Sequence, residues 1–377
     1  MNPAMKSFHW CICTTHMEAS QCGAGILPAA FHKSCRRMVA PRFTYPHAML
    51  KLVVLALFPL SLTSTLSAQD LAGRRDDTIP AQAELVYEKG LKFLASSQNE
   101  KGAWNDSVGS EAGVVGLAVA AFLAHGEDPV NGPYAMNIRN GIDYILTQQN
   151  TKNGYIGSSM YNHAFATKAL AEAYGVVDNP KIAPALKQAV DLILSSQKRN
   201  RFGAWRYTPD SRDADTTVTG CQLVTLFAAR NAGIAVPDEA IRRALAYLNN
   251  NRGSEGSYGY TSASGGKPTL TAIGLLCLSL AKETDSKGFQ TSLEYLKKNL
   301  DYRDRYYPYY YEYYMSQALF HADDETWREW NARNIRYLAT IQAADGSFPG
   351  NQGPSFNTAG ALLSLALNYR FLPIYEK

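Results

Sequence analysis

The chain has 377 residues, of which 46% are hydrophobic and 19% are charged, so it can build a large core and lacks the composition of a disordered protein. Its formal net charge is +4, but the first 68 residues hold six Lys and Arg and one Glu, which leaves the rest of the chain at about −1. The positive excess therefore does not indicate a nucleic-acid-binding surface, and no nucleic-acid partner is expected.

The N-terminal region predicts export. Residues 49–68 contain Lys51, an apolar run over 52–62 and small residues at the end, which is typical of a signal peptide. We expect a secreted or periplasmic protein. Residues 1–48 are interpreted as a disordered extension upstream of the true start at Met49, with a long leader or a metal-binding extension as the alternative. Residues 69–80 form a linker, and the folded domain spans 81–372.

After the N-terminal region, one kind of turn recurs about every 50 residues. In each copy a Gln or Asn near the end of an amphipathic segment precedes a glycine and then a bulky residue; we call this the repeat turn. The copies run Gln98 to Trp104, Gln149 to Ile156, Gln197 to Trp205, Asn250 to Tyr258 and Gln342 to Phe348. Their glycines lie 52, 49, 53 and 90 residues apart, so the last interval holds two units and six units are predicted.

Two kinds of helix alternate around these turns. The segment before each turn is amphipathic, as in 83–97, and should face water on one side. The segment after each turn is apolar and rich in small residues, as in 112–124 or 270–281, and should be buried all round. Helical hairpins are predicted at 81–125, 133–174, 180–232, 237–282, 287–321 and 326–370.

Six hairpins with apolar inner members predict an all-α fold, a single-barrel (α/α)6 toroid with an inner and an outer ring of helices. An open superhelical solenoid is the alternative. No later apolar run is long enough for a membrane-spanning helix.

The repeat turn resembles the QW repeat of squalene and oxidosqualene cyclases, and residues 80–370 are similar to the squalene cyclase and prenyltransferase superfamily. The resemblance implies the α/α toroid and an apolar cavity that takes an isoprenoid ligand.

The sequence Asp213-Ala214-Asp215-Thr216-Thr217 resembles the Asp-x-Asp-Asp-Thr motif of class II terpene cyclases. The resemblance implies that Asp215 is a general acid and that Asp213 tunes it, although Thr216 stands where that family has its last aspartate. If the inner helices are parallel, their N-termini share one mouth of the ring, where a ligand is expected. The plain alternative for Asp215 is a helix N-cap.

Further substrate-binding candidates share this predicted mouth. They are Glu111, His163 and Trp205, with Tyr310, Tyr313 and Tyr314 from a tyrosine-rich stretch that replaces the fifth repeat turn. No metal and no cofactor is expected. Cys221 and Cys277 are interpreted as core residues, with a disulfide left open.

Three functions stay open at this point: a terpene-cyclase-like protein, a non-catalytic toroid that binds a ligand or a protein, and an extracellular carbohydrate-active enzyme using Glu111, Asp215 and Arg206. A partner protein covering the mouth of the ring is a further alternative.

Overall fold

The computed structural model describes residues 79–107 and 109–376, and these residues form helices and no strands beyond isolated bridges. The outer helices are α2 (Ala81–Ser97), α4 (Ala135–Thr147), α6 (Ile182–Arg199), α8 (Asp238–Asn250), α10 (Lys287–Lys297) and α12 (Asp324–Ile341). The inner helices are α3 (Ala112–His125), α5 (Met160–Ala173), α7 (Thr216–Asn231), α9 (Pro268–Leu280), α11 (Pro308–Ala322) and α13 (Pro354–Leu365). The predicted segments 1–48 and 49–68, and most of the linker, lie outside the described residues.

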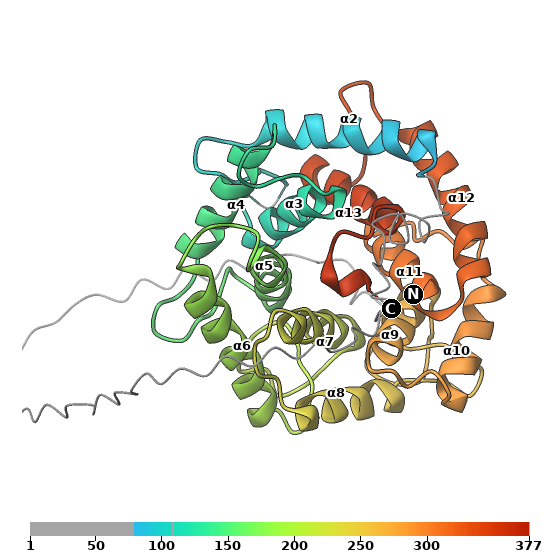
Figure 1. The fold of residues 1–377 in the computed structure, drawn as a ribbon. Coiled ribbons are helices and arrows are strands. Elements are labelled where there is room, and N and C mark those ends of the chain that lie inside the picture. Colours follow the sequence, from blue (N-terminus) through green and yellow to red (C-terminus); the bar gives the residue numbers. More distant parts are fainter. Residues whose placement is uncertain (1–78, 108, 377) are drawn as a thin grey trace, which may run out of the picture. The chain divides into compact units, whose positions relative to one another are not determined.

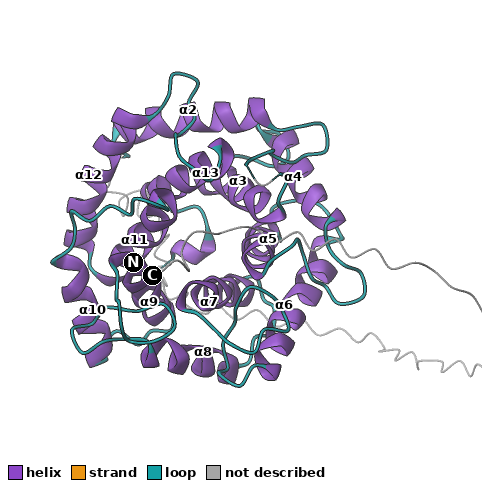
Figure 2. Ribbon diagram, turned by 180° about the vertical axis from the view of Figure 1, so that it is seen from behind, coloured by secondary structure: helices purple, strands orange, loops and turns teal. Residues whose placement is uncertain are grey.

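The helices form two closed rings (Figure 1). Each inner helix packs against the next, and α13 returns to pack against α3, while α12 contacts α2 in the outer ring. Figure 2 shows the same closed arrangement from behind. The predicted (α/α)6 toroid is therefore confirmed, and the open solenoid is wrong because the first and last hairpins meet. No helix among the described residues is long and apolar enough to cross a bilayer.

Glutamine side chains join successive hairpins. In four repeat turns the Gln amide donates to the carbonyl of its own turn glycine and to a carbonyl of the next outer helix. Gln197, for example, donates to Gly203 O and to Ala240 O, both at 2.8 Å. Gln342 donates to Val86 O at 2.9 Å and so ties the last turn to the first helix. Each amide thus bonds one carbonyl of its own turn and one carbonyl of the next outer helix.

The fourth and fifth turns use other side chains, a donor in the fourth and an acceptor in the fifth. In the fourth, the Ser292 hydroxyl donates to Gly256 O at 2.8 Å from the next outer helix. In the fifth, Asp304 Oδ1 accepts from the backbone N–H groups of Tyr306 and Tyr307 at 3.0 Å, and its Oδ2 accepts from Thr269 at 2.8 Å. A carboxylate thus replaces the glutamine and glycine there.

Small residues set the spacing of the inner ring, as predicted. A Cβ placed on Gly116 would lie 2.6 Å from the carbonyl oxygen of Phe165, so the backbones of α3 and α5 meet directly at this glycine.

The chain returns to the ring after α13. The short 3-10 helices η2 (Ala366–Asn368) and η3 (Pro373–Tyr375) follow, and η3 lies inside the inner ring, where it contacts α7 (Figure 1). Ile374 and Tyr375 are buried there. The C-terminal segment therefore fills part of the space between the inner helices, which we call the lumen.

Candidate functional site at the start of the inner helices

Asp215 begins α7 as its N-cap. Its Oδ1 accepts hydrogen bonds from the backbone N–H of Val218 at 2.8 Å and from the Thr217 hydroxyl at 2.6 Å. This is the usual capping role of aspartate, so the plain interpretation of Asp215 accounts for one of its oxygens.

The second oxygen, Oδ2, has a different environment. It is buried and accepts no hydrogen bond from the described residues, and the nearest cation is Arg206, whose Nε lies 3.8 Å away. Burial raises the pKa of Asp215, while its hydrogen bonds and the Arg206 charge oppose that rise. Because Oδ1 already accepts two donors, Oδ2 is the oxygen left to exchange a proton with a ligand.

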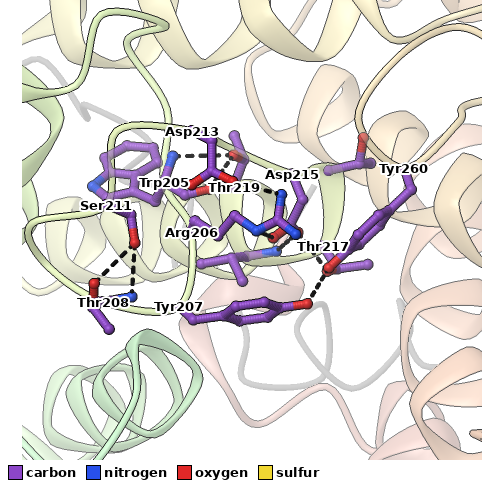
Figure 3. A network of polar contacts seen from close by, with 12 residues as sticks. Trp205, Arg206, Tyr207, Thr208, Ser211, Asp213, Asp215, Thr217, Thr219 and Tyr260 are labelled. Atoms are coloured by element: carbon purple, nitrogen blue, oxygen red, sulfur yellow. Dashed lines mark hydrogen bonds and ion pairs between the residues drawn. The ribbon is translucent and has the colours of Figure 1, made fainter. Parts of the chain in front are cut away.

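Arg206 connects two carboxyl groups and two rings (Figure 3). Its Nη1 lies 3.1 Å from Asp213 Oδ2, and its guanidinium lies 5.0 Å from the ring centre of Tyr207 and 5.5 Å from that of Tyr260. The two tyrosine hydroxyls share a hydrogen bond. The guanidinium is thereby held in place beside Asp215 by charge and by the ring faces.

A line of polar and aromatic contacts runs from Asp215 along the lumen. Because Thr217 donates to Asp215, its oxygen accepts from the Tyr161 hydroxyl at 2.5 Å. The Tyr161 ring meets that of Tyr310 edge-on at 6.4 Å. Three elements, α5, α7 and α11, supply these residues.

The line continues with the tyrosines of α11. Tyr314 hydrogen-bonds Cys221 Sγ at 2.9 Å, and Tyr310 lies 3.6 Å from the same sulfur. The Tyr313 ring packs on Phe165 at 6.2 Å. The structure therefore brings the predicted residues Tyr310, Tyr313 and Tyr314 together in the lumen, where burial raises the pKa of Cys221 to about 12.

Glu111 lies at the start of α3 in a separate polar cluster. Both of its oxygens lie 3.1 Å from Ser158 Oγ, and Oε2 accepts from Asn162 at 2.6 Å. Asn162 Oδ1 in turn accepts from the backbone N–H of Gly113. Burial raises the pKa of Glu111. Glu111 lies at the same end of the ring as Asp215 because both residues precede parallel inner helices.

His163, a predicted substrate-binding residue, is buried, and its ring bonds backbone groups. Its Nδ1 accepts from the backbone N–H of Ile156 at 3.1 Å and its Nε2 donates to Ala189 O at 3.0 Å, so both nitrogens are used. Burial lowers its pKa to about 4, which keeps the ring neutral. Thr219 and Thr271 accept from the equivalent N–H groups of the third and fourth turns, so His163 performs a repeat role.

Trp205, also predicted to bind substrate, is buried as well. It is 2% exposed, and its indole N–H donates to Ile193 O at 2.9 Å, on the preceding outer helix. Thr216, at the position of the missing aspartate, is also structural, because its hydroxyl donates to Gly259 O at 2.7 Å. Trp205 therefore ties its turn to α6, and Thr216 ties the start of α7 to the fourth turn.

The free cysteines Cys221 and Cys277 are both buried. Among the described residues, no group of three or more His, Cys, Asp or Glu side chains is arranged to hold a metal ion. Two surface hollows lie beside Trp327 and Asn331, and beside Tyr155 and Ser195, and neither is lined by Asp215.

Comparison with solved structures shows the fold. The type II terpene cyclase MstE from Scytonema, in complex with geranylgeranyl dihydroxybenzoate, is 15% identical, with a TM-score of 0.55 over 78% of this chain and 98% of that one. The α-1,6-mannanase of Salegentibacter, solved with α-1,6-mannotriose, is 11% identical, with a TM-score of 0.57 over 76% of this chain and 98% of that one.

A family 76 glycoside hydrolase from Bacteroides thetaiotaomicron gives a TM-score of 0.59 at 10% identity, over 76% of this chain and 77% of that one. No family model matches the chain, and no curated protein matches it. The fold is therefore the toroid shared by terpene cyclases and these hydrolases. At such identities the likeness extends to the fold alone.

Several residues of the site were missed in the sequence. Tyr161, Tyr207 and Tyr260 carry no motif of their own, and they meet only because α5 and the turns before α7 and α9 are neighbours in the ring. Lys168 and Glu172 were also missed, although charged residues within an otherwise apolar helix are a detectable signal.

Proposed function

We propose that this protein is a terpene-cyclase-like toroid that takes an apolar, isoprenoid-type ligand in its tyrosine-lined lumen, with Asp215 as the general acid. The observation that carries the proposal is the buried Oδ2 of Asp215, which accepts no hydrogen bond from the described residues, beside a line of tyrosine rings. An acid that protonates an alkene must keep its proton in a site without water, and burial favours the neutral carboxyl.

The roles of the neighbouring residues follow from their contacts. Asp213 and Arg206 set the charge beside Asp215, because the guanidinium contacts both carboxyl groups. The tyrosine faces stabilise positive charge on the ligand as it forms. The fold is shared with a cyclase solved with a geranylgeranyl compound. The predicted signal peptide places this activity outside the cytoplasm as part of the proposal.

The test is incubation of the full chain with geranylgeranyl phenols, with native mass spectrometry for binding and product analysis for turnover. We expect Asp215→Asn to bind the ligand but lose turnover by at least 100-fold, since the amide cannot donate the proton. Asp213→Asn is the control, because this carboxylate is 64% exposed and should reduce turnover by about tenfold or less. A chain that neither binds nor converts any isoprenoid would remove the proposal.

A carbohydrate-active enzyme is the second candidate. It is supported by the carboxyl groups of Asp213 and Asp215 next to the part-exposed rings of Tyr207 and Tyr260, since carboxyl pairs hydrolyse glycosides and aromatic rings stack on sugars. Release of mannose from α-1,6-linked mannan, lost in Glu111→Gln or Asp215→Asn, would favour this candidate. A chain that binds an isoprenoid without turnover would instead be the non-catalytic binding toroid.

A further inference from the structure

Lys168 is a buried lysine without a polar partner in the middle of the lumen. It lies on α5 and is 4% exposed. Among the described residues its ammonium makes no hydrogen bond and no ion pair; its recorded contacts are the ring faces of Tyr313 at 5.8 Å and Tyr375 at 6.0 Å. Burying a lysine to this extent is costly unless an anion or several acceptors surround its ammonium.

Glu172 does not supply that anion. It lies one turn further along α5, its Oε1 is buried without a hydrogen bond, and no ion pair joins it to Lys168. Burial raises the pKa of Glu172 to about 7, against the opposing effect of the Lys168 charge. Near neutral pH this carboxyl is therefore only partly ionised and offsets the Lys168 charge only in part.

The lysine shares one helix face with the aromatic part of the site. Positions 161, 165, 168 and 172 are spaced by four, three and four residues, so they line the same side of α5. Tyr161 contacts Tyr310, and Phe165 contacts Tyr313, across the lumen. Lys168 lies seven residues beyond Tyr161, which is about 10 Å along the helix axis.

We infer that Lys168 is the anion-binding end of the lumen, and that the ligand is an amphiphile whose acidic head group, a carboxylate or a phosphate, binds this ammonium. The inference rests on the proposed function, because the isoprenoid chain of such a ligand occupies the aromatic stretch between Tyr161 and Tyr313. The reactive end of the chain then lies toward Asp215. The head group takes the place of the Tyr375 ring, which the C-terminal segment now holds near the lysine.

The experiment compares three probes of one chain length on the full protein: geranylgeraniol, geranylgeranoic acid and geranylgeranyl monophosphate. Affinities come from isothermal titration. We expect the acid and the phosphate to bind at least tenfold tighter than the alcohol, and Lys168→Met to remove this preference while changing the affinity of the alcohol by less than threefold. Which of the two anions binds tighter separates a carboxylate head group from a phosphate.

Three further variants complete the design. Glu172→Gln removes the competing carboxylate. It should increase the affinity for geranylgeranoic acid severalfold without changing the affinity for geranylgeraniol. Lys168→Arg keeps the charge and should keep the preference. Lys92→Met removes a lysine that is 67% exposed on α2 and should change nothing. If Lys168→Met does not fold, the Glu172→Gln result decides in its place.

Each outcome has one meaning. Equal binding of alcohol and anions by the wild type, or a preference that survives Lys168→Met, overturns the anion site and leaves the proposed function standing. Loss of the preference in Lys168→Met supports it. Failure of all three probes to bind overturns the proposed function, and the anion site with it.

Discussion

The third and the fifth turns occupy the same place in two hairpins, yet different atoms hold them. In the third, the buried amide of Gln197 bridges its own turn and the next outer helix. In the fifth, the Asp304 carboxylate accepts from two backbone N–H groups ahead of α11 and from Thr269. In the third turn, the Gln197 side chain joins two neighbouring hairpins. The fifth leads into the helix that supplies three tyrosines to the lumen.

Comparing the two regions separates the residues that stabilise the repeat from the residues that line the lumen. Where the glutamine and glycine are present, the glutamine side chain bonds backbone carbonyls. Where they are lost, α11 still carries a buried carboxyl without a partner among the described residues: Glu312 has no hydrogen bond to either oxygen, as Asp215 Oδ2 has none after the third turn. We therefore expect the regular turns to be sensitive to side-chain size and hydrogen bonding, and the fifth hairpin to be sensitive to pH.

The largest effect is expected for Gly256→Ala in a regular turn. Gly256 has a φ of +93°, and a Cβ there would lie 2.2 Å from the carbonyl oxygen of Thr291. We expect the variant to lose about 4 kcal/mol of unfolding free energy in urea denaturation. Gly265→Ala is the control, because its φ is +70° but nothing lies near its Cβ, so backbone strain alone should cost about 1 kcal/mol. Equal losses would show that the close backbone contact does not matter.

The buried Glu312 should make the stability of the fifth hairpin depend on pH. Burial raises its pKa from 4.5 in the unfolded chain to about 8 in the fold, with Arg303 opposing the rise. The folded state keeps the proton that the unfolded chain releases above pH 4.5, so the stability from this group is complete below that pH and is lost as the pH rises toward 8.

Glu312→Gln mimics the neutral acid and removes this loss. The variant should therefore exceed the wild type in unfolding free energy by a margin that grows with pH, by roughly 3 kcal/mol between pH 5 and pH 8. Urea denaturation at these two pH values measures the margin. A margin that is constant with pH would mean that Glu312 is already ionised in the fold.

The third prediction compares the two turns directly. Gln197→Ala leaves two buried carbonyls without their donor and should cost about 2 kcal/mol. Asn299→Ala in the fifth turn removes one bond to Tyr295 O within the same hairpin and should cost less than about 1 kcal/mol. Thermal denaturation of the two variants side by side gives the ratio. A larger loss for Asn299→Ala would reverse the comparison drawn between the turns.

The fold could be predicted because its signal is repeated. A glycine and a bulky residue every 50 residues, with apolar helices after them, leave few arrangements other than a ring of hairpins. The degenerate fifth unit was found only from the interval between Gly256 and Gly346. Closure of the ring needed the structure, since the Gln342 bond to Val86 joins residues far apart in sequence.

The site could be predicted only where a motif marks it. Asp215 was found from its motif, and Tyr310, Tyr313 and Tyr314 from their crowding. For the other residues, a role at the site depends on which side of the inner helix faces the lumen. His163 lies two residues from Tyr161, which is about 200° around the helix, so it faces α6 while Tyr161 faces the lumen. Register within a buried helix is not visible when nearly all of its residues are apolar.

The bond from Gln342 to Val86 is a seam that spans 256 positions of the chain. Contacts of such separation form late, because the intervening polymer must be ordered first. During synthesis, five completed hairpins still expose apolar inner helices to solvent. The ring can close only after the sixth hairpin has left the ribosome. A truncated product is therefore expected to need chaperones as soon as it emerges.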